Sequence, residues 1–100
     1  MIKISVKKEN DIIKEIKVTG HANYADYGKD IVCAAVSSIT TTTINDILIL
    51  DNKAISYDAQ DGNMIITNND NELANKLLTV MLNSLEDLAN DYPKNISIGG

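Results

Sequence analysis

The stretch from Asp30 to Asp51, DIVCAAVSSITTTTINDILILD, decides which class of fold the chain adopts. Its middle part, Ser38 to Ile44, is rich in β-branched residues, which favour strands. Without Gly or Pro, however, the stretch is too long for an ordinary strand. Apolar or β-branched residues also recur at spacings of three to four, as in a helix: Val32, Val36, Ile39, Thr43, Ile47 and Leu50. The sequence therefore predicts a helix that is apolar on more than one side and covered on two faces.

Residues 2–7 before this helix alternate between apolar and polar, and so do residues 12–18, which is the period of a half-buried strand. These two segments are expected to pair as a hairpin, and the short segments 54–58 and 64–67 after the helix are expected to pair as a second one. The first hairpin turns at the polar residues 8–11. The second turns at Asp61-Gly62, since both residues tolerate positive φ.

A second helix follows, and its start resembles a capping box with Asn69 as cap and Glu72 three residues later. Its expected apolar stripe is Leu73, Leu77, Met81, Leu85, Leu88 and Tyr92. Pro93 ends the helix, and 95–98 form a last short strand. The order ββ-α-ββ-α-β predicts one α+β domain over residues 1–100, in which small antiparallel sheets cover the two helices in a layered sandwich.

Composition narrows the function classes. The chain has 100 residues, 44% hydrophobic and 23% charged, as in an ordinary globular protein. We expect no apolar stretch long enough to span a bilayer, and the alternating N-terminus is unlike a signal peptide. A single cysteine excludes an internal disulfide and suits the reducing cytoplasm. With one histidine as well, we expect no metal site and no cofactor.

The charge balance argues against direct nucleic-acid binding. All nine basic residues are lysines, against 14 acidic residues, and the formal net charge is −5. Affinity for nucleic acids depends largely on Lys and Arg that neutralise phosphates, and Arg is best suited to bidentate recognition. An acidic chain would instead attract a basic protein partner or substrate.

The single histidine and the single cysteine lie near each other in the sequence. His21 ends a strand and Cys33 opens the long helix. Asp30 is a favourable N-cap, which would place Cys33 in the first helical turn, where the dipole and unpaired N–H groups favour a thiolate. His21 could act as acid and base, and the first-turn N–H groups, including that of Cys33, could form an oxyanion hole. Ser37 lies one turn further on the same face.

Each of these residues also has a structural interpretation. A cysteine in an apolar helix is usually buried packing, and a lone histidine is more often a structural hydrogen-bonding residue than a catalyst. Ser37 could simply bond back to its own backbone. Tyr24 and Tyr27 fit either an ordinary loop or a mobile lid.

The run GHANYADYGKDIVCAAVSS, residues 20–38, resembles the signature of the ribosomal-processing cysteine protease family, known as Prp. The resemblance implies a dyad of Cys33 and His21, with Asp30, Gly20 and Ser37 supporting the site. It also implies homodimers and removal of an N-terminal extension from large-ribosomal-subunit protein twenty-seven, cut after an apolar stretch that ends in an aromatic residue. The implied substrate loop, thought to move aside for substrate, comprises Ala22, Asn23, Tyr24, Ala25, Asp26, Tyr27, Gly28 and Lys29.

Two other classes of function stay open at this point. A non-catalytic ribosome-assembly or protein-binding module would need no reactive cysteine. A small thiol-dependent acyl-transfer enzyme with another substrate would use the same residues, and only a cleavage assay separates it from a protease.

Overall fold

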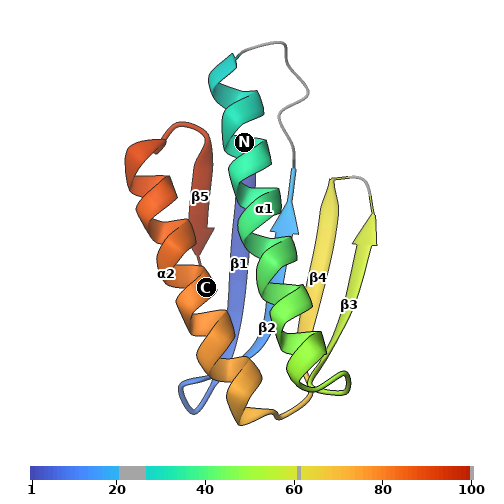
Figure 1. Cartoon of the computed structure of the whole chain (residues 1–100). Helices are drawn as coiled ribbons and strands as arrows, with labels where there is room; N and C mark the ends of the chain where they lie inside the picture. The colour runs from blue at the N-terminus through green and yellow to red at the C-terminus, as the bar shows by residue number, and fades with distance from the viewer. Residues whose placement is uncertain (21–26, 61, 100) are drawn as a thin grey trace.

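The computed structural model describes residues 1–20, 27–60 and 62–99, and only the backbone of 27–30. The elements follow the order ββ-α-ββ-α-β (Figure 1). They are β1 (Ile2–Glu9), β2 (Ile12–Thr19), α1 (Tyr27–Leu50), β3 (Ile55–Gln60), β4 (Asn63–Asn68), α2 (Glu72–Asp91) and β5 (Ile96–Gly99). The α+β class and the element order predicted from the sequence are confirmed.

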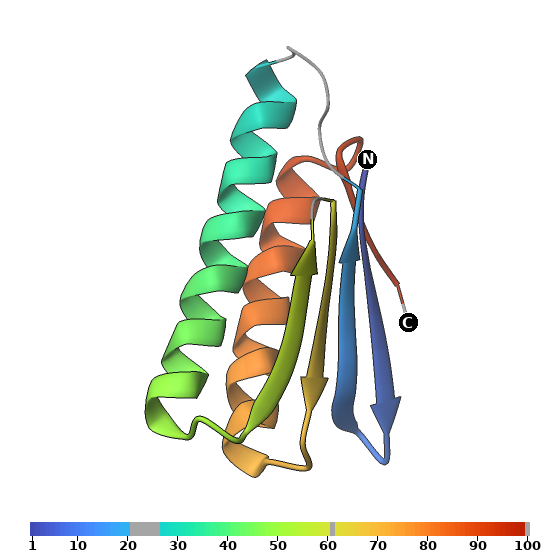
Figure 2. The same cartoon turned by 90° about the vertical axis from the view of Figure 1, so that its right-hand side faces the viewer.

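The strands form one mixed sheet in the order β3-β4-β2-β1-β5, and both helices lie on the same face of it (Figure 2). The expectation of small antiparallel sheets is wrong in this respect, because β5 runs parallel to β1. The crossover through α2 returns the chain to the free edge of β1, where the Ile2 N–H donates to the Asn95 carbonyl at 2.9 Å. The local pattern of a short strand does not encode which edge it joins.

The first hairpin turns at only two residues, Asn10 and Asp11, with φ of 53° and 65°. Lys8 and Glu9, predicted to belong to the turn, continue β1 instead. Positive φ at both central residues matches the twist of the flanking strands, and Asn and Asp tolerate it. The pairing of the hairpin shifts register between Lys7 and Lys8.

The core lies between the sheet and the helices. From α1 it receives Val32, Val36, Thr40, Ile44 and Ile47. Thr40 is buried because its hydroxyl donates to the Val36 carbonyl at 2.9 Å, which satisfies the polar group within the helix. Three residues of the apolar stripe predicted for α1 are not fully buried: Ile39 and Thr43 are half-buried, and Leu50 is exposed.

One face of α1 has no cover within the described residues. Ile31, Ile49 and Leu50 are 57%, 82% and 63% exposed, so the described part of the chain does not provide the predicted cover on two faces. Residues Ile31–Leu50 are also long and apolar enough to cross a membrane by length and composition. The expectation that no stretch approaches that length is therefore wrong, although one side of this helix packs on the sheet.

The N-cap of α2 is Asn71, not Asn69 as the sequence suggested. The Asn71 side chain accepts from the Ala74 N–H at 2.9 Å. Asn69 instead donates to the Lys53 carbonyl at 3.0 Å, and Asp70 turns the chain with a φ of 55°. Several adjacent residues here are good caps, so the tertiary contacts of Asn69 decided which one begins the helix. As predicted, the helix ends before Pro93.

Candidate active site

Cys33 is the seventh residue of α1, counting from Tyr27. It is half-buried and packs against the hydrophobic core. The helix begins three residues before Asp30, so Asp30 is not its N-cap, contrary to the sequence prediction.

This earlier start changes how the helix can assist Cys33. The seventh N–H of an α-helix is bonded within the helix, since only the first four are left without intrahelical partners. The backbone N–H of Cys33 is therefore not available as an oxyanion donor, and the helix dipole is strongest one turn before it. The helix terminus therefore gives the Cys33 thiol less electrostatic assistance than the sequence analysis expected.

Cys33 lines a cavity of about 250 Å³. Its walls come from three parts of the chain: α1, the strands β1 and β2 where they meet Gly20, and the β3–β4 hairpin. The lining residues are Ile2, Val18, Gly20, Cys33, Val36, Ser37, Gln60, Gly62, Asn63 and Met64. They include a thiol, apolar side chains and uncharged polar groups, a combination that suits an uncharged peptide segment next to the thiol.

Three of the residues singled out from the sequence meet in this cavity. Gly20, Cys33 and Ser37 all line it, and Ser37 is exposed one helical turn beyond Cys33. His21 and the loop residues 22–26 lie outside the described residues. Tyr27, Gly28 and Lys29, expected as part of that loop, form the first turn of α1.

Position 20 requires a glycine, because of its backbone conformation and because a backbone atom of Met1 lies close to it. Its φ is +82°, and a Cβ at this position would lie 2.4 Å from the Met1 carbonyl oxygen. Its N–H donates to the Gly62 carbonyl at 3.0 Å, which joins the end of β2 to the β3–β4 hairpin. Gly20 thus fixes the point where the chain leaves the sheet immediately before His21.

We expect Gly20→Ala to destabilise the protein by more than about 1 kcal/mol, since the substitution combines strain at positive φ with a backbone clash. Urea denaturation of the variant and the parent measures this difference. Gly99→Ala is the matched control, because a Cβ there has no atom within 4 Å. Equal destabilisation by the two substitutions would contradict this role for Gly20.

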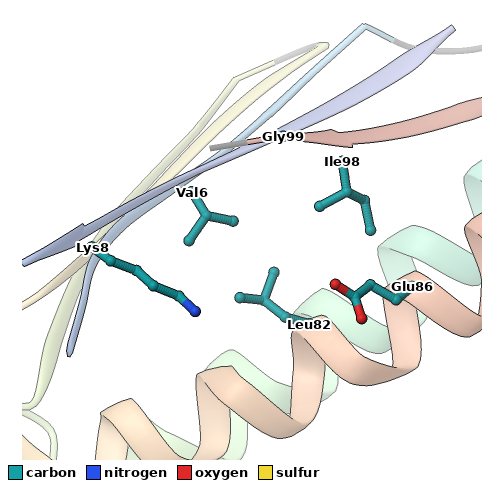
Figure 3. A pocket seen from close by; sticks show the side chains of 6 residues that line it. All are labelled: Val6, Lys8, Leu82, Glu86, Ile98 and Gly99. Atoms are coloured by element: carbon teal, nitrogen blue, oxygen red, sulfur yellow. The ribbon is translucent and has the colours of Figure 1, made fainter. Parts of the chain in front are cut away.

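A larger cavity of about 530 Å³ lies elsewhere, between α2 and the edge of the sheet. Figure 3 shows Val6, Leu82 and Ile98 in this cavity, with Lys8 on β1 and Glu86 on α2 at opposite sides. None of the described residues that line it is a cysteine, a histidine or a hydroxyl nucleophile. By its size this cavity would be the better candidate for the active site, but its lining offers no group for nucleophilic catalysis.

Comparison with known proteins decides between the classes of function. The model of the family described as cysteine protease Prp matches residues 1–97. The chain belongs to this family. A Prp relative, the ribosomal processing cysteine protease of Staphylococcus aureus strain Mu50, is 34% identical over 103 residues, covering 97% of this chain and 94% of the relative. The chain is therefore a cysteine protease by family.

Two solved Prp structures share the fold. The S. aureus enzyme in complex with a substrate peptide superposes with a TM-score of 0.91 and 27% identity over the full length of both chains. The same enzyme with a covalently linked product peptide gives a TM-score of 0.88 and 29% identity, over 99% of this chain and 98% of that one. The S. aureus enzyme is thus known with peptides bound.

Sequence reasoning did not find the part of the cavity that β3 and β4 contribute. Gln60, Asn63 and Met64 are ordinary residues of a strand or its end, and no local signal distinguishes them. Among the described residues, no three His, Cys, Asp or Glu side chains gather as a metal site would require.

Proposed function

We propose that this protein is an endopeptidase that removes the N-terminal extension of large-ribosomal-subunit protein twenty-seven, with Cys33 as nucleophile and His21 as general base and acid. The observation that carries the proposal is the position of Cys33 in a cavity shared with Gly20, the residue before His21. Membership of a family of ribosomal processing proteases supports the same reaction.

The reaction has two balanced halves. His21 takes the thiol proton while the Cys33 sulfur attacks the scissile carbonyl carbon, and it then gives that proton to the departing amine. The carbon–nitrogen bond breaks and a thioester forms. In the second half His21 takes a proton from water while the hydroxyl attacks the thioester carbon. The carbon–sulfur bond breaks, which releases the new carboxyl end, and His21 returns its proton to the Cys33 sulfur.

The supporting residues have separate roles in this proposal. Gly20 fixes the point where the chain leaves β2, directly before His21. Ser37 presents a hydroxyl to the cavity one turn beyond the sulfur. Asp30 lies one helical turn before Cys33 on the backbone and has a supporting role only, with no part in the proton transfers.

The charge of the chain fits a basic ribosomal protein as substrate, and its single thiol fits a reducing compartment such as the cytoplasm. The net charge of −5 attracts a basic ribosomal protein, whereas nine lysines without arginine are a poor basis for binding RNA. A reducing compartment keeps the single thiol reactive. Metal ions and cofactors have no part in the proposed steps.

The test is to incubate the purified protein with the ribosomal precursor from the same genome, under reducing conditions, and to read the products by intact mass. We expect a single cut near the N-terminus of the precursor. Replacing the aromatic residue before the cut with Ala should slow cleavage by about 10-fold or more, because a well-filled pocket contributes about 1–3 kcal/mol of discrimination.

An intact precursor after prolonged incubation would contradict the proposed substrate. Cleavage of another acyl compound would then support an acyl-transfer enzyme. Tight binding of the precursor without turnover would support a protein-binding module, the other class that the sequence left open.

We further propose that the protein is a homodimer whose interface includes the outer side of the helices. The helices cover one face of the sheet, and their other side has no cover from the described chain (Figure 2). Ile49 on α1 and Val80 on α2 are 82% and 60% exposed there. A second copy that packs on this side would provide the cover that the sequence pattern of α1 predicts.

Ile49→Lys should shift the protein from dimer to monomer in sedimentation velocity, because it places a charge in an apolar interface. Ile12→Lys, at an exposed site next to the β1–β2 turn, is the control and should leave the dimer intact. A monomeric parent protein, or an unchanged dimer in the Ile49 variant, would contradict this interface.

A further inference from the structure

The side of the Cys33 cavity formed by β4 contains one side chain suited to control its size. We propose that Met64 is a specificity-determining residue, and that it limits which side chain is accepted on the substrate residue whose carbonyl Cys33 attacks. The proposal rests on the proposed function and names a part of the same site that no sequence pattern indicated.

The position of Met64 follows from the sheet register. Met64 pairs with Val18 on β2 and with Ala59 on β3. Side chains alternate along a strand, so Met64 shares the helix-facing side of the sheet with the buried Ile66. Ile65, between them, points to the opposite face. Met64 thereby lines the cavity together with Cys33, which is 64 − 33 = 31 positions away in sequence.

The chemistry of thiol attack places one substrate side chain next to this wall. The sulfur bonds to the carbonyl carbon, and the Cβ of the same substrate residue is only two bonds from that carbon. Its side chain must therefore occupy space that adjoins Cys33. The cavity there is about 250 Å³, and none of the described residues that line it is charged, so it accepts an uncharged, mainly apolar side chain.

Among the apolar lining residues, Met64 is the one free to set the cavity volume. Ile2, Val18 and Val36 are 4%, 9% and 4% exposed and belong to the core, where a change of size disturbs the packing of the whole fold. Met64 is only half-buried and packs against the edge of the core. Its unbranched thioether chain adapts to irregular space, which suits a wall that contacts substrate.

The experiment compares Met64→Ala, which enlarges the cavity, with Met64→Phe, which fills it. The readout is the ratio of kcat/KM for two peptides that carry Trp or Leu at the residue before the cut. We expect Met64→Ala to shift this ratio about 10-fold toward Trp and Met64→Phe to shift it about 10-fold toward Leu, the scale of discrimination in an apolar pocket. Ile65→Ala is the matched control on the same strand and should leave the ratio unchanged.

Alkylation of Cys33 provides a second readout that does not need peptide cleavage. The probes are iodoacetamide and N-benzyl iodoacetamide, and the measurement is the ratio of their labelling rates by intact mass. Met64→Ala should favour the benzyl reagent and Met64→Phe should disfavour it. If no peptide is cleaved but the labelling ratio changes in the two Met64 variants as expected, the proposed protease function is contradicted and the proposed role of Met64 in the pocket is kept.

If peptides are cleaved and both Met64 variants keep the parent ratios, the role of Met64 is overturned while the protease function stands. That role is also overturned if Ile65→Ala moves the ratios as much as the Met64 variants, since the effect would then come from the strand and not from the cavity wall.

Discussion

Replacing Cys33 with Ala should abolish peptide cleavage, since the chain has no second thiol to replace the nucleophile. The fold should survive, because Cys33 is half-buried in α1 and Ala is a good helix former. Intact-mass detection of precursor cleavage and a thermal melt measure these two outcomes. Cys33→Ser should be nearly as inactive, since a hydroxyl needs stronger activation than a thiol.

Ser38→Ala is the matched control for Cys33→Ala. Ser38 is an exposed residue of α1 and is not among the residues that line the Cys33 cavity, so its loss should leave both cleavage and melting nearly unchanged. Cleavage by Cys33→Ala at a measurable rate, with contaminating protease excluded, would remove Cys33 from the mechanism and with it the proposed function.

Replacing His21 with Ala should lower the cleavage rate by a factor of about 10²–10⁴, the usual contribution of a general acid–base group. The physical reason is that both halves of the reaction need a proton moved, first from the thiol to the departing amine and then from water. His21 is the only histidine in the chain and therefore the only side chain that ordinarily exchanges protons near neutral pH.

His21→Gln separates proton transfer from a structural role. Glutamine can donate and accept hydrogen bonds but does not exchange protons near neutral pH, so this variant should be as slow as His21→Ala. Added imidazole should partly restore the Ala variant. Full activity in His21→Gln would show that the histidine only holds the site in place.

Features of the fold that depend on neighbouring residues were easier to predict than contacts between distant residues. The strand alternation from Ile2 and the helical spacing after Val32 depend only on neighbouring residues, and both elements appeared where predicted. Element ends were less predictable. The helix start moved from Asp30 to Tyr27 and the cap of α2 from Asn69 to Asn71. At α2 several adjacent residues are good caps, and the tertiary contacts of Asn69 decided between them.

The candidate site was also predictable only in part, because some of its residues are brought together by contacts between distant parts of the chain. Residues 20–38 carry the resemblance to Prp, and within them Gly20, Cys33 and Ser37 line one cavity. The place of Cys33 within its helix was not predicted, because its distance from the helix terminus depends on where the helix starts.

By itself, the sequence determined the α+β class, the order of the elements, the family and the residue pair proposed for catalysis. Only the tertiary structure decided that β5 joins β1 in parallel, that Gly20 packs against the Met1 carbonyl, and that Met64 lies beside Cys33. Periodicity and capping are properties of neighbouring residues. Contacts between distant residues depend instead on which packing of the whole chain buries the most apolar surface with its polar groups satisfied, and no local pattern records that choice.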